Sequence, residues 1–221
     1  LRLLCTKDQD RADLLAQKVN DVNTDRKELT FALIDQAKRQ AEQQKYNKFL
    51  VIGSPEWNPG IIGLVASRMI EEYYKPTVVW GSSSESPNIY KASARSIKGF
   101  NIIDAITENS AHLISFGGHP MAAGFSFQPQ SLDNFTKAIT ASSKSISEEM
   151  LIQSLEVDCK LPLSLASETL FRELQTLKPF GTQAEEPLFY ESNIQIIDAQ
   201  ALGATNKHLK LKIANPQTKK P

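Results

Sequence analysis

FGGHPMAAG, the nine residues from Phe116 to Gly124, carry the strongest architectural and functional signal in this chain. Two adjacent glycines let a backbone approach another group closely, and their amides can face an anion. A histidine directly after them is held at the same place, as a hydrogen-bond donor or a metal ligand. The small residues that follow predict a close-packed strand. A Gly-Gly turn before a lone histidine is also a common loop, so this stretch needs a second signal.

The second signal lies upstream, in residues 91–96 (KASARS), which alternate small and polar side chains. Arg95 stands there between the hydroxyls of Ser93 and Ser96. A guanidinium fork and two hydroxyls on one short strand are suited to reading a phosphate. The same pattern is also typical of an edge strand with solvated polar residues, and the residues alone leave both interpretations open.

Further upstream, the sequence predicts a parallel crossover unit. Residues 48–53 (KFLVIG) and 76–81 (PTVVWG) are apolar strands, and an amphipathic helix from residue 61 to 70 connects them. Trp57 and Asn58 follow the first strand, at the carboxyl end where such folds place ligands. Trp57 fits the edge of a core equally well. Downstream we expect a helix over 102–111 capped by Asn101, a Gly-Gly-His loop, a strand over 123–128 and a helix over 131–150.

The two ends of the chain differ from this middle part. Residues 6–44 predict two helices that are interrupted at Asn23-Thr24-Asp25. After Met150 the pattern predicts strands over 151–161, 188–203 and 208–213, with a short helix over 165–177. These would form a small antiparallel sheet with fewer strands than the five of an OB barrel.

Composition limits the possible functions. The 221 residues carry 25 basic and 25 acidic side chains, so any phosphate site must be local rather than a basic surface. The exception is the end, where five lysines and no acid follow Asp198. No apolar run approaches the ~20 residues of a membrane helix, so we expect no membrane association. Cys5 and Cys159 form no CxxC pair, which indicates reduced thiols in a cytoplasmic protein.

The three histidines are too scattered to build a metal centre. A two-metal site needs several carboxylates and histidines that converge on ions ~4 Å apart. We therefore predict no metal ligand in this chain.

Five blocks in this order resemble the C-terminal portion of the RecJ family, the single-strand-specific 5′–3′ DNA exonucleases of the DHH phosphoesterase superfamily. They are residues 56–68 (EWNPGIIGLVASR), 93–96 (SARS), 117–124 (GGHPMAAG), 178–181 (KPFG) and 208–211 (HLKL). The resemblance covers essentially the whole chain. It implies an α/β fold class: a helical connector over 1–47, a DHH-associated domain with a central mixed sheet flanked by helices over 48–150, and a partial OB-like β domain over 151–221.

The resemblance also implies roles for individual residues. Ser93 and Arg95 would bind the 5′-terminal phosphate of single-stranded DNA, and His119 would be the catalytic residue beside the metal centre. The further substrate-binding residues would be Trp57, Asn58, Ser96, Gly117, Gly118, Lys207, His208 and Lys210. Ala92 and Asn58 depart from the family pattern, which usually has glycine and often histidine at these places.

The enzyme implied is a metal-dependent phosphodiester hydrolase of DNA repair and recombination. Its Mn²⁺ or Mg²⁺ ions would be held by a DHH domain upstream of Leu1, so we expect this chain alone to be inactive. The sequence leaves open which proteins of DNA repair could be its partners.

Three alternatives stay open. A nanoRNase or cyclic-dinucleotide phosphodiesterase of the same superfamily shares the Gly-Gly-His block but generally ends near it. A non-catalytic nucleic-acid-binding module agrees with the lack of metal ligands. A third interpretation, the editing appendage of alanyl-tRNA synthetase, fits the sequence less well, because that appendage lacks the OB-like tail.

Overall fold

The computed structural model describes residues 1–83, 86–181, 184–203, 206 and 208–214. The chain divides into two compact units, Leu1–Gln153 and Ser154–Pro221. The predicted connector and α/β domain both fall in the first unit, and the boundary at residue 47 stays a prediction. Within the described part of the chain, no helix is long and apolar enough to cross a membrane.

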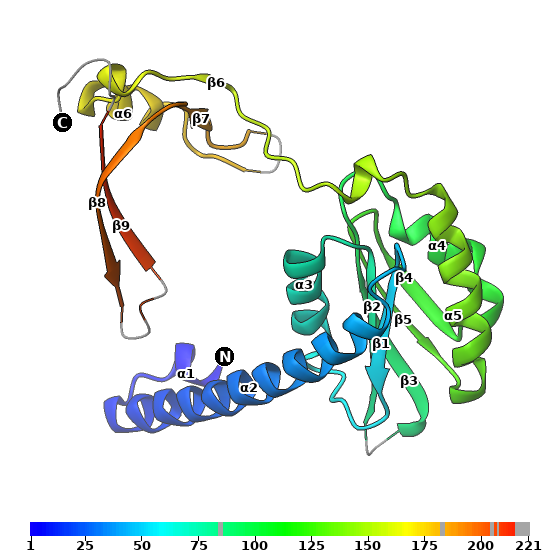
Figure 1. Ribbon diagram of the computed structural model, residues 1–221. Coiled ribbons are helices and arrows are strands. Elements are labelled where there is room, and N and C mark those ends of the chain that lie inside the picture. The colour runs from blue at the N-terminus through cyan, green and yellow to red at the C-terminus, as the bar shows by residue number, and fades with distance from the viewer. Residues whose placement is uncertain (84–85, 182–183, 204–205, 207, 215–221) are drawn as a thin grey trace. The chain divides into compact units, whose positions relative to one another are not determined.

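A five-stranded mixed sheet forms the centre of the first unit, in the order β1-β2-β3-β5-β4 (Figure 1). Its first two strands are parallel and the others are antiparallel, so the predicted crossover unit and the mixed sheet are confirmed. The strands are β1 (Leu50–Ser54), β2 (Thr77–Ser83), β3 (Ser86–Arg95), β4 (Ser115–His119) and β5 (Ala122–Phe127).

Helices cover the two faces of this sheet. α2 (Gln9–Gln43) and α3 (Ile62–Tyr73) lie on one face, and α4 (Ile102–Glu108) and α5 (Leu132–Ala141) on the other (Figure 1). Each face has its own core, and the one under α4 and α5 is rich in aromatic rings. Its fully buried or nearly buried aromatic side chains are Phe49, Trp80, Phe100, Phe125, Phe127 and Phe135.

α2 is one continuous helix of 35 residues, so the predicted interruption at Asn23-Thr24-Asp25 is wrong. The polar side chains there bond within the helix instead of breaking it. Thr24 Oγ1 donates to the Asn20 carbonyl at 3.1 Å, a bond to the preceding turn that an α-helix tolerates. Asp8 is the N-cap residue of the helix, and its carboxylate accepts from the Arg11 amide. Its buried residues, Ile34, Ala37 and Ala41, all lie in its last third.

The Gly-Gly-His segment is not a loop, as the sequence predicted, but the edge strand β4. It pairs with β5 in a hairpin, in which His119 lies opposite Ala122 and Gly117 opposite Gly124. Two residues, Pro120 and Met121, make the turn. The Pro120 carbonyl accepts from the Ile102 amide at 3.0 Å, which ties the turn to the start of α4.

Two helix predictions also differ from the structure. α5 ends at Ala141, after which short 3₁₀ turns replace the predicted continuation to Met150. Asn101 is the N-cap residue of α4, but its side chain donates to the Asp104 carboxylate at 2.6 Å rather than capping a backbone amide.

The second unit contains two separate strand pairs and a short helix. β6 (Cys159–Lys160) and β7 (Phe189–Tyr190) are parallel, whereas β8 (Gln195–Leu202) and β9 (His208–Ala214) form an antiparallel ribbon. α6 (Glu168–Gln175) lies between β6 and β7 in sequence. The predicted strand over 151–161 is reduced to Cys159–Lys160, and the predicted ribbon strands are present.

Candidate functional site

Three rows of residues cross the sheet on the face that carries α3. Side chains of successive residues alternate between the two faces of a strand, and directly paired residues share a face. The register therefore gives the rows Arg95–Ala122–His119, Ser93–Gly124–Gly117 and Lys91–Ser126–Ser115. We call this surface the groove face. The opposite face of β3 presents Ala92 and Ala94 to the core.

The middle row is nearly free of side chains. Gly124 and Gly117 lie side by side on neighbouring strands, and we call this pair the glycine floor. A Cβ atom added to Gly117 would meet nothing within 4 Å, and one on Gly124 would meet only the Ala92 carbonyl, at 3.8 Å. The floor is therefore open to an approaching ligand.

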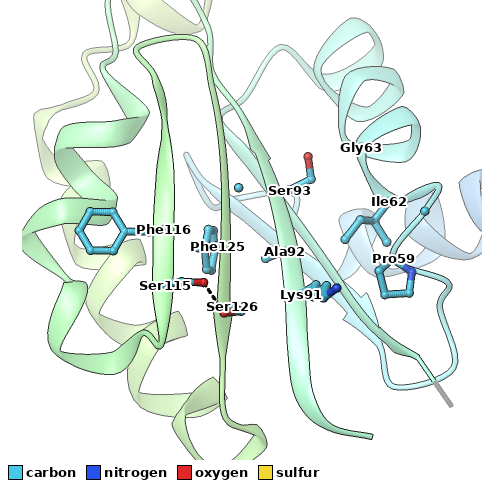
Figure 2. Close-up of a pocket in the computed structure, with 12 residues that line it drawn as sticks. Pro59, Ile62, Gly63, Lys91, Ala92, Ser93, Ser115, Phe116, Phe125 and Ser126 are labelled. Atoms are coloured by element: carbon cyan, nitrogen blue, oxygen red, sulfur yellow. Dashed lines mark hydrogen bonds between the residues drawn. The ribbon is translucent and has the colours of Figure 1, made fainter. Parts of the chain in front are cut away.

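A groove of about 510 Å³ lies over part of this surface, the row of Lys91 and the Ser93–Gly124 part of the middle row, between β3, β4 and β5 and the start of α3. Figure 2 shows Lys91 and Ser93 on β3, Pro59 and Ile62 at the start of α3, and the hydroxyls of Ser115 and Ser126 bonded to each other. The distance between these two hydroxyls is 2.7 Å. None of the residues that line the groove is acidic, so its chemistry suits an anion.

Arg95 stands beside the groove and is held by its neighbours. Its Nε donates to Ser67 Oγ at 3.2 Å, and its Nη1 donates to Ser93 Oγ at 3.0 Å and to the Ala94 carbonyl at 2.9 Å. Ser67 in turn donates to the Gly63 carbonyl of α3 at 3.1 Å. These bonds fix the plane of the guanidinium and leave Nη2 without a partner among the described residues. A guanidinium fixed in this way is suited to bind phosphate oxygens.

Gly63 makes room for this arrangement. A Cβ atom at this position would lie 3.3 Å from Ser93 Oγ and 3.5 Å from Arg95 Nη2. The first turn of α3 therefore approaches the Ser93–Arg95 pair closely because residue 63 has no side chain.

His119 is exposed at the end of β4, in the same row as Arg95. Two strand spacings separate their backbones, about 10 Å. The structure thus brings Ser93, Arg95, Gly117 and His119 together on one face, although β3 and β4 are far apart in sequence.

Gly118 has a different environment from Gly117. Its side-chain position points at β5, where a Cβ atom would lie 2.5 Å from both the Ala122 carbonyl oxygen and Ala123 Cα. Gly118 is thus required for the packing of the hairpin and does not contribute to the glycine floor.

Two of the predicted substrate-binding side chains lie in the interior, which corrects the sequence prediction. Trp57 is 1% exposed, packs against α2 and α3, and donates from Nε1 to Gln36 Oε1 at 3.0 Å. Ser96 is 4% exposed and bonds the Phe100 carbonyl through its hydroxyl. Both polar groups are satisfied inside the protein, so neither is available to a substrate.

Asn58 is exposed, and its side chain accepts from the Gly60 amide at 2.8 Å, which shapes the turn before α3. In the second unit, His208 and Lys210 are exposed on one face of the ribbon, opposite Leu202 and Gln200. Lys207 lies outside the described residues.

The described residues do not fit a metal centre, because they contain no group of three or more His, Cys, Asp or Glu side chains that could hold an ion. A shifted pKa in the first unit lies away from the groove. Burial and the hydrogen bond from its hydroxyl to Glu42 raise the pKa of Tyr73, at the contact of α2 with α3.

Several residues of the site were missed in the sequence. Lys91 could have been found, since it alternates with Ser93 and Arg95 along one strand. Ser67 and Gly63 are one helical turn apart in α3, but nothing in the sequence pairs that helix with Arg95. Ser115 and Ser126 meet only through the register of the hairpin.

Two family models match successive parts of the chain. Residues 46–145 match the family model of the DHHA1 domain, and residues 157–220 match that of the RecJ OB domain.

Similar proteins carry the RecJ name. The single-stranded-DNA-specific exonuclease RecJ of Bacillus subtilis is 31% identical over 97% of this chain, and the chain spans 28% of its length. The corresponding protein of Haemophilus influenzae is 27% identical over 96% of the chain, which spans 38% of it. The crystal structure of RecJ in complex with Mn²⁺ from Thermus thermophilus superposes with a TM-score of 0.77 at 27% identity, over 98% of this chain and 32% of that one.

Proposed function

Because the chain carries a DHHA1 domain followed by a RecJ OB domain and belongs to the RecJ family, we propose that it is the substrate-binding part of a single-stranded-DNA-specific 5′–3′ exonuclease. Its relatives bear the name of such an exonuclease, and it spans well under half of their length. The proposed work of the whole enzyme is phosphodiester hydrolysis in DNA repair and recombination, in the cytoplasm.

Within this enzyme the groove binds the 5′-terminal phosphate. The observation that carries this proposal is Arg95, whose guanidinium is fixed by Ser67 and Ser93 while Nη2 keeps its donors for a ligand. Ser93 accepts from Arg95 and so keeps its own hydroxyl proton for a phosphate oxygen. The glycine floor offers backbone in place of side chains, so Gly117 and Gly124 place no side chain against a base edge.

His119 acts at the other end of the same row, one strand beyond β5. An imidazole can donate a hydrogen bond or move a proton near neutral pH, which suits a place beside the bond that breaks. We propose that Mn²⁺ or Mg²⁺ is held outside this chain, since its described residues do not supply a ligand set. The related Thermus thermophilus structures contain Mg²⁺ and Mn²⁺.

The OB unit would also contact the DNA strand. On the ribbon β8–β9, His208 and Lys210 share an exposed face with Gln200, where they could contact phosphates. Such contacts depend on charge and stacking, so the enzyme would favour single strands without a sequence preference.

The test compares 5′-phosphorylated and 5′-hydroxyl single-stranded DNA of one sequence, labelled at the 3′ end. Arg95→Ala should weaken binding of the phosphorylated strand to the chain about tenfold, the loss of one charge-assisted contact, and leave the hydroxyl strand unaffected. Arg68→Ala is the control, because Arg68 is an exposed arginine of α3 paired with Glu71. An Arg95→Ala chain with the wild-type preference for the phosphorylated end would contradict the proposal.

A further inference from the structure

Lys91 is the basic residue of the groove to which neither the sequence pattern nor the proposed function gives a role. It lines the groove together with Ser93, and it lies on the same face of β3 as Ser93 and Arg95. The two cations therefore flank Ser93 along one strand, each two residues away, or about 6.8 Å at the backbone.

The neighbours of Lys91 offer no counter-charge. On one side Lys91 pairs with Gly81 of β2, and on the other with Ser126 of β5, whose hydroxyl already bonds Ser115. Gly81 cannot carry a side chain, because a Cβ atom there would collide with the Trp57 carbonyl. Lys91 is exposed and forms no ion pair with any described residue. Its charge is thus available to a ligand in the groove.

Charge balance shows what such a ligand would be. A terminal phosphate monoester has a second pKa of about 6 and carries nearly two negative charges at neutral pH, whereas an internal diester carries one. Arg95 supplies one positive charge, and part of its fork is committed to Ser67, Ser93 and the Ala94 carbonyl. A diester needs no more than Arg95, but a monoester dianion leaves one charge unmatched.

We propose that Lys91 is the second cation of the site that binds the terminal phosphate, which we call the terminal-phosphate seat and which comprises Ser93 and Arg95. We propose that Lys91 discriminates a 5′-phosphate monoester from a phosphodiester. The inference rests on the proposed function, since it places the terminal phosphate at Ser93 and Arg95. Lys91 extends from β3 toward the phosphate from the side opposite Arg95. The two cations then bind different oxygens of one dianion.

The experiment measures binding of the 221-residue chain to the two strands described above, by fluorescence anisotropy, over a series of salt concentrations. Lys91→Met, which keeps the length of the side chain and removes its charge, should reduce the preference for the 5′-phosphate about fivefold. The slope of log affinity against log salt should fall by about 0.7 for the phosphorylated strand and stay the same for the hydroxyl strand. Lys91→Arg should restore the preference.

Lys137→Met is the matched control, because Lys137 is an exposed lysine on α5, which covers the other face of the sheet. It should change neither strand. Since Lys91 is exposed, thermal unfolding of Lys91→Met should match that of the wild type, and this measurement separates a lost contact from a lost fold.

The outcomes separate the inference from the proposed function. If Lys91→Met keeps the wild-type preference while Arg95→Ala loses it, the seat is real and Lys91 has no part in it. If Lys91→Met weakens both strands equally, Lys91 contacts DNA without selecting its end, and the inference is wrong. If the wild-type chain itself binds both strands equally, the terminal-phosphate seat is wrong as well.

Discussion

At the scale of single residues, the adjacent glycines of β4 make a matched pair for experiment. Gly117→Ala places a methyl group in open space above the glycine floor, so stability should be unchanged and binding of 5′-phosphorylated DNA should weaken. Gly118→Ala drives a methyl group into the β5 backbone and should destabilise the fold by about 1–3 kcal/mol. Thermal melts and anisotropy titrations on both variants check this. Equal melting temperatures for the two variants would show that the hairpin geometry is misassigned.

Among the single residues predicted for the site, some lie on the groove face and others are buried in the core. Ser93 and Arg95 were predicted from residue types that suit a phosphate, and His119 from its place after two glycines. The register places all three on one face, and their roles stay predictions. Trp57 was chosen for its place after the first strand and Ser96 for its hydroxyl, and both side chains are buried. A sequence shows that an indole or a hydroxyl is present, but its burial depends on partners such as Gln36 and Phe100, which lie elsewhere in the chain.

At the scale of elements, α3 supports the site through a residue that lacks a side chain. Gly63→Ala should stabilise the helix by up to about 1 kcal/mol, because alanine has the higher helix propensity. The same methyl group would lie 3.3 Å from Ser93 Oγ, closer than an ordinary contact, and should lower the preference for a 5′-phosphate. A variant that melts higher and binds the phosphorylated strand less tightly is the expected result.

A second variant for the same contact is Ser67→Ala, which removes the acceptor for Arg95 Nε without adding bulk. It should also lower the preference, through a looser guanidinium. If Gly63→Ala keeps the wild-type preference for 5′-phosphorylated DNA, the close approach of α3 to Arg95 does not contribute to phosphate binding.

Elements were predicted best where a strand or helix is buried and regular. The apolar runs of β1 and β2 and the amphipathic pattern of α3 were predicted close to their observed bounds. β4 was missed because its pairing with β5 depends on a two-residue turn, and glycines usually indicate a loop. The continuity of α2 was missed because Asn, Thr and Asp disfavour helix interiors in general, whereas here the side chains of Asn23 and Thr24 bond within the helix.

At the scale of the whole molecule, the described residues lack the ligand set of a metal-dependent hydrolase. We therefore expect the 221-residue chain to bind single-stranded DNA without cleaving it. The measurement is release of mononucleotides from end-labelled, 5′-phosphorylated DNA in the presence of Mn²⁺, against a buffer control. An active RecJ of full length serves as the positive control, and release by the chain above the buffer level would refute the expectation.

α2 gives the first unit a further mechanical property. At a rise of about 1.5 Å per residue, some 33 Å of helix separate the buried Ala37 from Leu15. A tilt of the helix by about 10° at Ala37 would displace Leu15 by roughly 6 Å, about the length of an extended lysine side chain. Atoms beside Ala37 would move by less than a bond length. A small rotation at the buried end of α2 would therefore become a displacement of several ångströms at its exposed end.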